Sequence, residues 1–348
     1  MLVANELSFP SLSQPFKRRF AAGIDVSGCE ARLVVLSRRA RRTAPVRVEW
    51  LGAVPLDRTA MVGVHIADRA AVSCAIAALF AKWPRRRAMG SLFCSMAIPG
   101  GAMLIDSIPL SFPLPHQGRA MRTAALEAME PAVYAHAERL AGLERQALAV
   151  DWFVDEANRG CGLAPAASSH ADGASRIGIA AAAREHLEAR VEAAAAAGIV
   201  LSAVDGEPPA ALRALCHAAE CELHDGERYA AVWIGGDGVY GWRIADEAVE
   251  AQMRYPAPEH ADLAAALRGM ALGQALDCVV AGGDFDLLGG CGMTLADVGD
   301  LLGCAVLPFE CAPLLDPDLH DSLGGACPQA HVPTFAVAFG LALRGVCE

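Results

Sequence analysis

Two short stretches of small residues are the places where this sequence could bind a phosphate group. The first runs from Asp25 through Ser27 to Gly28, and the second is Gly235-Gly236-Asp237-Gly238. A turn of Gly, Ser or Asp lets the backbone approach phosphate oxygens and point its N–H groups at them, while an acidic residue can hold a magnesium-bound water. Tight hairpin turns need glycine in any protein, so neither stretch identifies a site by itself.

Two further stretches complete an ordered series of such motifs. Asp205 to Ala211 contains Glu207 and ends the first half of the chain, and Gly282-Gly283 follows a later apolar segment. Ordinary structural roles remain open for the acidic residues. Asp25 could cap a turn, and Glu207 could lie in the first turn of a helix, where the macrodipole favours a carboxylate.

Each candidate turn lies between segments that have the pattern of β-strands. Residues 22–27 and 31–37 flank the first turn, with 46–53 as a third strand, and residues 229–234 and 239–244 flank the second. The plan of strand, glycine turn and strand thus occurs twice. This repetition predicts an internally duplicated chain.

The remaining elements follow from hydrophobic periodicity and from turn residues. We predict, in chain order, a helix capped by Asp68 that continues to Trp83, a hairpin of residues 92–98 and 103–109 around Pro99-Gly100-Gly101, a helix over 119–143 that Pro131 interrupts, a loop over 157–175, a helix opened by Pro208 and Pro209, helices over 259–276 and 294–302, strands over 278–281 and 305–307, and a final helix opened by Pro333.

A βαβ unit over residues 176–204 is the clearest of the predicted arrangements. A strand over 176–181 leads into a helix over 184–197, which turns Leu187, Val191 and Ala194 inward and ends before a second strand. Such a unit predicts a parallel sheet covered by helices, and hence an α/β fold class.

Composition narrows the partners and the compartment. The chain has 348 residues and a formal net charge of −11, which disfavours the positive potential that nucleic acids and anionic lipids require. The twelve cysteines include no C-x-x-C pair, so zinc-like cysteine spacing is not seen. Residues 1–16 resemble a mobile tail without a secretory signal, and we expect a cytoplasmic protein with no nucleic-acid partner.

Five longer motifs occur in a fixed order along residues 20–346. They are Gly23-Ile24-Asp25, Met96 to Gly100 with Ser107 to Leu110, Val150-Asp151-Trp152, Val204 to Pro208, and Ala336 to Arg344. Together they resemble the PilM family of type IV pilus assembly proteins, which belongs to the FtsA branch of actin-like proteins. The Ile98-Pro99-Gly100 turn is the most specific part, because it lies where this branch carries a relocated small subdomain.

The resemblance implies a two-lobed actin-like fold, of the duplicated ribonuclease H-like type, with an FtsA-type accessory subdomain. We expect residues 1–16 to be a flexible tail and residues 17–85 and 176–224 to form the first lobe. Residues 86–175, including the loop 157–175, would form the accessory subdomain, and residues 225–348 the second lobe.

The resemblance also implies an ATP and magnesium site between the lobes. Its candidate residues are Asp25, Ser27, Gly28, Glu207, Gly235, Gly236, Gly282 and Gly283, with Asp25 also as the magnesium residue. Two departures affect this site. The family's glycine and serine are here Ser27 and Gly28, in swapped order, and the family's second acidic residue is Trp233, whose indole cannot hold a magnesium water. We therefore expect weak or absent ATP hydrolysis and assign no catalytic residue.

The partners implied by the resemblance are proteins. We expect residues 86–155 and the neighbouring strands to form a groove for the N-terminal cytoplasmic peptide of a PilN-like inner-membrane protein, bound as an extended chain along sheet edges. The complex would couple to a pilus motor ATPase. The chain itself would reach the inner membrane only through its partners.

Two other functions stay open from the sequence. One is an active ATPase or small-molecule kinase of the actin-like superfamily, against which Trp233 and the lack of a recognisable substrate base both argue. The other is an FtsA-like filament tethered to the membrane, which needs an amphipathic C-terminal helix after a linker. The sequence given ends at Glu348, directly after the last predicted helix.

Overall fold

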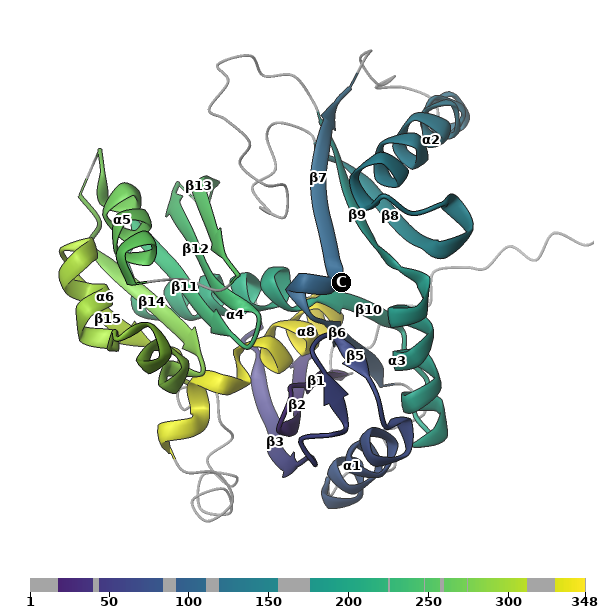
Figure 1. The fold of residues 1–348 in the computed structure, drawn as a ribbon, viewed down its shortest axis with the longest axis horizontal. Helices are drawn as coiled ribbons and strands as arrows, with labels where there is room; N and C mark the ends of the chain where they lie inside the picture. Colours follow the sequence, from purple (N-terminus) through teal and green to yellow (C-terminus); the bar gives the residue numbers. More distant parts are fainter. Residues whose placement is uncertain are drawn as a thin grey trace, which may run out of the picture.

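The structure is a computed structural model with two sheet-containing lobes and a smaller accessory unit (Figure 1). It describes residues 18–39, 44–83, 92–110, 119–155, 176–224, 226–246, 248–256, 260–273, 275–311 and 329–347. The predicted tail over 1–16 and the predicted loop over 157–175 lie outside these residues. None of the helices within these ranges combines the length and apolar character that crossing a bilayer takes.

The first lobe is built on a five-stranded mixed sheet in the order β10-β6-β1-β2-β3. Its strands are β1 (Arg18–Val26), β2 (Glu30–Arg39), β3 (Arg47–Pro55), β6 (Phe93–Ile98) and β10 (Ala203–Gly206). The first three are antiparallel neighbours, and β6 and β10 run parallel to β1. Helices α1 (Arg69–Lys82) and α3 (Arg184–Ala196) contact each other on this lobe, and Asp68 caps α1 as predicted. Between β3 and α1 lies a small hairpin of β4 (Met61–Val62) and β5 (His65–Ile66).

The second lobe repeats this arrangement strand for strand. Its sheet has the order β13-β12-β11-β14-β15, again with three antiparallel strands followed by two parallel ones. The strands are β11 (Tyr229–Gly235), β12 (Gly238–Ala245), β13 (Ala248–Tyr255), β14 (Cys278–Gly283) and β15 (Ala305–Pro308). Helices α5 (His260–Ala271) and α6 (Leu295–Leu302) accompany this sheet, and α6 begins with a capping box from Thr294. The predicted internal duplication is confirmed.

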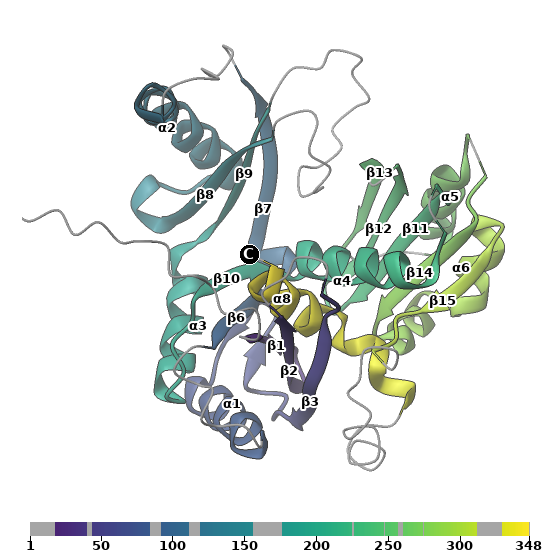
Figure 2. The same ribbon diagram turned by 180° about the vertical axis from the view of Figure 1, so that it is seen from behind.

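Two helices lie between the lobes (Figures 1 and 2). They are α4 (Glu207–Glu222) and α8 (Ala336–Cys347), and α8 follows a 3-10 segment over Gln329–Phe335 that contains Pro333. Their backbones meet at Gly340, where a Cβ would strike the carbonyl group of Ala210. One hydrophobic core therefore includes both helices and the inner faces of both sheets.

The accessory unit is a three-stranded antiparallel sheet with one helix on it. Its strands are β7 (Met103–Pro109), β8 (Leu148–Asp155) and β9 (Arg176–Ala183), in the order β7-β9-β8. Helix α2 (Arg119–Ala141) continues through Pro131 and packs on one face, where Val133 meets Ile177 and Ile179 in a separate small core. In both views α2 lies on the side away from the second lobe (Figures 1 and 2).

Two sequence predictions about strand partners are wrong. The segments 92–98 and 103–109 do not form a hairpin, because a 3-10 turn over Gly100–Ala102 leads the chain from the first sheet into the accessory sheet. Residues 176–204 do not form a βαβ unit, since β9 pairs antiparallel with β7 and β8 whereas β10 pairs with β6. Periodicity shows that a segment is a strand, but it does not choose the strand's partner.

The face of α3 also differs from the prediction. Val191 is exposed, whereas His186, Ala189, Arg190, Ala193 and Ala194 are buried. The predicted domain boundaries stay predictions, but two strands belong to a different unit from the one to which these boundaries assign them. β6 belongs to the first sheet although it falls within residues 86–175, and β9 belongs to the accessory sheet although it begins at residue 176.

Candidate functional site

The first hairpin places Asp25 at the end of β1, directly opposite Arg32 on β2. Asp25 is buried, and its Oδ2 accepts a hydrogen bond of 3.2 Å from Arg32 Nη1. The other terminal nitrogen of this guanidinium, Nη2, lies 3.0 Å from Glu30 Oε2. Burial raises the pKa of Asp25, and the adjacent Arg32 guanidinium opposes that rise. The carboxylate that the sequence assigned to magnesium thus has a cationic partner within the protein.

The turn after Asp25 is stabilised by its own side chains. The Ser27 hydroxyl donates to the Glu30 carbonyl over 3.2 Å and accepts from Arg32 Nη1 over 3.3 Å. Gly28 differs, since a Cβ there would meet no described atom within 4 Å. Of the three candidate residues in this turn, Asp25 and Ser27 contact Arg32. Only Gly28 has free space beside its backbone.

In the second hairpin an indole covers the backbone that was expected to bind phosphate. Trp233 is only 4% exposed, and a Cβ at Gly235 would lie 2.7 Å from Trp233 Cζ2. The Trp233 ring lies 5.1 Å from the Tyr240 ring, which stacks on Trp242 at 6.2 Å. Trp233 therefore belongs to the core between the lobes, with its ring over Gly235.

The turn of this hairpin contains Gly236 and Asp237, which join β11 to β12. Asp237 Oδ2 accepts a hydrogen bond of 2.9 Å from Tyr240 Oη, whereas its Oδ1 is buried without a hydrogen-bond partner among the described residues. Gly100 lies against this turn, because a Cβ on Gly100 would be 3.0 Å from Asp237 Oδ2. Arg254 Nη2 also donates to the Gly100 carbonyl over 3.3 Å. The second hairpin is thus joined directly to the turn that leads into the accessory unit.

Glu207 is the first residue of α4 and is buried. Burial raises its pKa well above the ordinary value, and the nearby carboxylates of Asp25 and Asp237 add to the rise. Arg190 and a backbone hydrogen bond from Gly100 act in the opposite direction. Burial and the carboxylates of Asp25 and Asp237 therefore disfavour the charged form of Glu207.

Arg190 is the buried cation next to these carboxylates. Its Nε donates to the Ala97 carbonyl over 2.6 Å, and its Nη1 donates to the His186 carbonyl over 2.9 Å. Burial lowers its pKa to about 10, while the charges of Glu207 and Asp25 oppose that change. Its hydrogen bonds go to backbone carbonyls at the edge of the first lobe.

Gly282 and Gly283 are the last residues of β14 rather than a separate turn. A Cβ on Gly282 would lie 3.1 Å from both Ala336 and Leu215, so this residue packs against the helices between the lobes. Gly283 has a φ of +104° and lies against the backbone of Ile234, which explains why glycine is needed there. Their role in adenosine binding stays a prediction.

Sequence reasoning missed Arg32, Arg190 and Asp237 as parts of the site. Arg32 could have been found, because a hairpin that turns at residues 28 and 29 places residue 32 opposite Asp25. Asp237 was within the second glycine stretch but had no predicted partner. The sequence did not indicate that Arg190 belongs to the site, since a basic residue on a helix is usually solvated.

These residues do not fit a magnesium-bound triphosphate. The Asp25 carboxylate is paired with Arg32, the Trp233 ring covers Gly235, and the carboxylates of Asp25 and Asp237 already act on the buried Glu207. The arrangement is suited to holding two hairpins and the accessory turn together rather than to activating a water molecule.

A solved structure supports the fold of this chain. No family model and no curated protein matches the chain. Among solved structures, the "PilM-PilN type IV pilus biogenesis complex" is similar with a TM-score of 0.68 and 19% identity, over 94% of this chain and 98% of that one. The ethanolamine utilization protein EutJ from Carboxydothermus hydrogenoformans has a TM-score of 0.42 and 16% identity, over 95% and 92% of the two chains. A Bacteroides thetaiotaomicron protein of unknown function with an actin-like ATPase fold has a TM-score of 0.45 and 9% identity, over 89% and 96%.

The likeness to the PilM–PilN structure covers both lobes and the accessory unit, since it extends over 94% of this chain. Together with the duplicated sheets it shows that the fold is α/β, two-lobed and actin-like, with an additional subdomain. The fold class predicted from the sequence is confirmed.

Proposed function

We propose that this chain is a PilM-like scaffold of type IV pilus assembly that binds a PilN-like membrane protein. The observation that carries the proposal is the fold shared with the PilM–PilN complex along nearly the whole length of both chains. The family motifs around Asp25, Gly100, Trp152, Glu207 and the C-terminal helix support the same conclusion.

The accessory sheet is the surface that we propose for the partner. Helix α2 covers the face that contains Ile177 and Ile179, so the strand residues that alternate with them point to the opposite face. Ile105 on β7 and Phe153 on β8 belong to this opposite face and are 37% and 42% exposed. Between them lies β9, where the Phe153 ring covers Gly178.

Such a face suits an extended peptide. Strands β7 and β8 are the two edges of the sheet and can offer unpaired backbone groups to an added strand, while Ile105 and Phe153 can pack against alternate side chains of the peptide. We propose the N-terminal cytoplasmic segment of a PilN-like protein as this peptide. The scaffold would then lie at the cytoplasmic side of the inner membrane through its partner, and it would couple that partner to a pilus motor ATPase.

ATP hydrolysis is not part of the proposed function. Arg32 neutralises Asp25, and Trp233 occupies the position of the family's second acidic residue. Nucleotide binding on the adenosine side, through Glu207, Gly282 and Gly283, remains a prediction. The competing function, an active ATPase or kinase, would need a magnesium site that this arrangement of charges does not fit.

Titration of the full chain with a synthetic peptide of a PilN-like N-terminal sequence tests the proposal. We expect saturable binding by the native protein and at least about tenfold weaker binding by Ile105→Asp and Phe153→Asp, because a carboxylate would have to be buried against apolar side chains. Leu287→Asp is the matched control, since Leu287 is 44% exposed but lies in the second lobe.

Circular dichroism establishes that each variant is folded before it is titrated. Loss of affinity in both accessory variants, with native affinity in Leu287→Asp, supports the accessory sheet as the binding surface. Native affinity in all three variants would overturn that surface, and absence of any binding by the folded native protein would overturn the scaffold function.

A further inference from the structure

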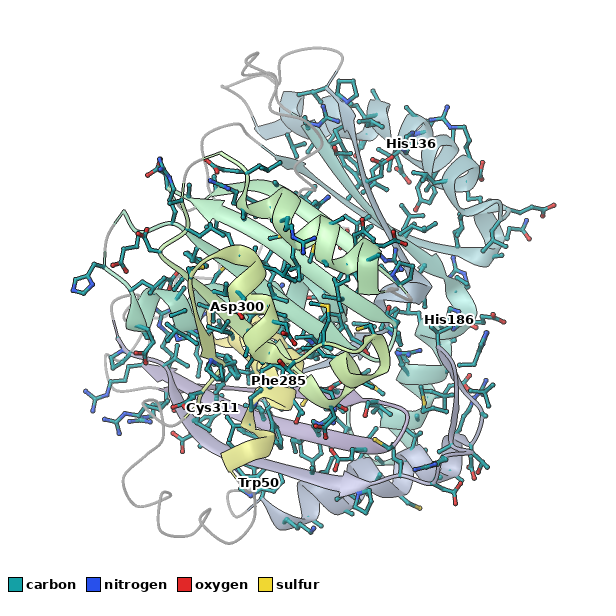
Figure 3. The ribbon with its side chains drawn as sticks, turned by 60° about the vertical axis from the view of Figure 1, so that its left-hand side comes forward. Trp50, His136, His186, Phe285, Asp300 and Cys311 are labelled. Atoms are coloured by element: carbon teal, nitrogen blue, oxygen red, sulfur yellow. The ribbon has the colours of Figure 1, made fainter. Side chains whose placement is uncertain are left out.

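A cluster of two imidazoles and one carboxylate lies at the base of the accessory unit, next to Arg190. His65 belongs to the small hairpin strand β5, and Glu185 and His186 lie in the first turn of α3. Helix α3 follows directly after β9, so the cluster joins the first lobe to the segment in which the chain returns from the accessory sheet. Figure 3 labels His186 there, below the accessory unit on which His136 lies.

The side chains of this cluster converge on one point. One potential ligand atom from each of His65, Glu185 and His186 lies within 4.8 Å of the other two. The two imidazole rings are 4.6 Å apart between centroids and are tilted by 53°, rather than stacked face to face. A tetrahedral zinc ion with bonds of about 2.0–2.1 Å holds its ligand atoms roughly 3.4 Å apart. Rotation of the exposed His65 and Glu185 side chains can supply the remaining approach of up to about 1.4 Å.

The backbone positions of the two histidines are fixed independently of any ion. Arg190 is almost completely buried, and its Nη1 donates to the His186 carbonyl over 2.9 Å. Its Nη2 donates to the carbonyl of Val64, the residue before His65, over 3.4 Å. One buried guanidinium therefore holds β5 and the start of α3 together, and this contact brings the three donors to one place before a ligand arrives.

From this geometry we infer that His65, Glu185 and His186 form a binding site for a divalent transition-metal ion, with zinc as the best-fitting ion. Two imidazole nitrogens and one carboxylate oxygen are a donor set that zinc accepts, with a fourth position left for water or an external ligand. Calcium and magnesium prefer oxygen ligands, so they fit this set less well. The site goes beyond the proposed scaffold function and does not depend on it.

A bound ion would act where the chain passes from the accessory strand β9 into the first-lobe helix α3. β5 packs with the first-lobe core through Ile66, whereas the accessory strands and α2 form their own small core. The ion would add a link between β5 and the N-terminal end of α3. We expect it to restrict the movement of the accessory sheet relative to the first lobe.

Calorimetric titration of the metal-free full chain with Zn²⁺ tests this inference. We expect one tight site per chain in the native protein. We expect affinity to fall by more than about 100-fold in His65→Ala, because even the loss of outer-shell groups costs about 10–100-fold at zinc sites. His65 is exposed, so we expect this variant to retain its fold, and Glu185→Gln provides a second variant at an exposed position. His224→Ala is the control, since His224 is an exposed histidine in the segment between α4 and β11.

Substitution with Co²⁺ separates this site from binding by cysteine. Nitrogen and oxygen ligands give visible d–d bands without a thiolate-to-cobalt charge-transfer band, and this spectrum is the expected one. Equal zinc affinity in the native protein and in His65→Ala would overturn the inference. So would a thiolate charge-transfer band as the only cobalt signal, or absence of zinc binding at micromolar concentrations.

Discussion

The identity of the residue opposite Asp25 decides what Asp25 can do. A carboxylate that faces Arg32 across the hairpin at 3.2 Å serves as half of a buried ion pair. Removing one partner of such a pair typically costs about 3–5 kcal/mol, because the other charge is left unpaired. The position of Asp25 could be predicted from the sequence, but its role depends on a cross-strand contact that only the register defines.

Glu207 provides a prediction about pH dependence. Burial and the carboxylates of Asp25 and Asp237 raise its pKa well above its ordinary value of 4.5. A pKa that is raised in the folded state means that the proton on Glu207 stabilises the fold fully below about pH 4.5, and that this contribution is lost as the pH rises through the raised pKa. We expect the stability of Glu207→Gln relative to the native protein to increase over the pH range from about 4.5 up to the raised pKa, by about 1.4 kcal/mol for each pH unit.

Urea unfolding at a series of pH values measures this difference. Glu222→Gln is a suitable control, since Glu222 is exposed at the other end of the same helix, and its difference from the native protein should change little with pH. A difference between Glu207→Gln and the native protein that stays constant over this range would show that Glu207 is not held in its protonated form.

Trp233 provides a second prediction at this scale. Because its ring lies in the core between the lobes and covers Gly235, we expect Trp233→Ala to lower the free energy of unfolding by about 3–5 kcal/mol. Trp233→Phe keeps an aromatic ring over Gly235 and should lose less than half as much. Equilibrium denaturation measures both values. A loss below about 1 kcal/mol in Trp233→Ala would contradict a core role for the indole.

At the scale of elements, the sequence correctly predicts features that depend on a few residues adjacent in the chain. Asp68 caps the start of α1 as predicted, and α6 ends at Leu302 as predicted, because capping depends on a few adjacent residues. Strand existence was also predictable, as for both glycine hairpins. The partners of β6 and β9 were not, since pairing is decided by contacts between residues far apart in the chain.

The close crossing of α4 and α8 predicts that alanine has opposite effects at Gly340, which lies in the crossing, and at Gly269, which lies outside it. A Cβ on Gly340 would overlap the carbonyl group of Ala210, and backbone cannot move aside as a flexible side chain can. We expect Gly340→Ala to destabilise the protein by about 1–3 kcal/mol. Gly269→Ala in α5 is the matched control, because a Cβ there meets no described atom within 4 Å and should stabilise the helix by about 0.4–1 kcal/mol. Thermal unfolding of both variants tests the contrast, and equal effects would contradict the close crossing.

At the scale of the whole molecule, the three units are not equally joined. The inner faces of both lobes share one core with α4 and α8, whereas the accessory sheet has a small core of its own. The fold class and the duplication were predictable from the repeated motifs. The shared core was not, because its two central helices, α4 and α8, follow the last strands of the two halves and lie far apart in the chain.

This difference predicts unequal local stability. We expect backbone amides of β9 to exchange with solvent at least about tenfold faster than those of β1 and β11, which corresponds to a difference of about 1.4 kcal/mol in opening free energy. Amides of β1 and β11 should be protected to a similar degree, since both strands adjoin the shared core. Native-state hydrogen exchange measures all three strands, and equal protection of β9 and β1 would show that the accessory sheet opens only with the lobes.

The central claim is that this actin-like chain acts by binding a partner rather than by hydrolysing ATP. The most direct test is a calorimetric titration of the full chain with a PilN-like N-terminal peptide, with and without magnesium and ATP, combined with an assay of ATP turnover in the same samples. We predict saturable peptide binding in both conditions, and turnover no higher than that of the Asp25→Asn variant. Magnesium-dependent turnover that Asp25→Asn abolishes, together with no peptide binding by the folded native protein, would contradict the claim.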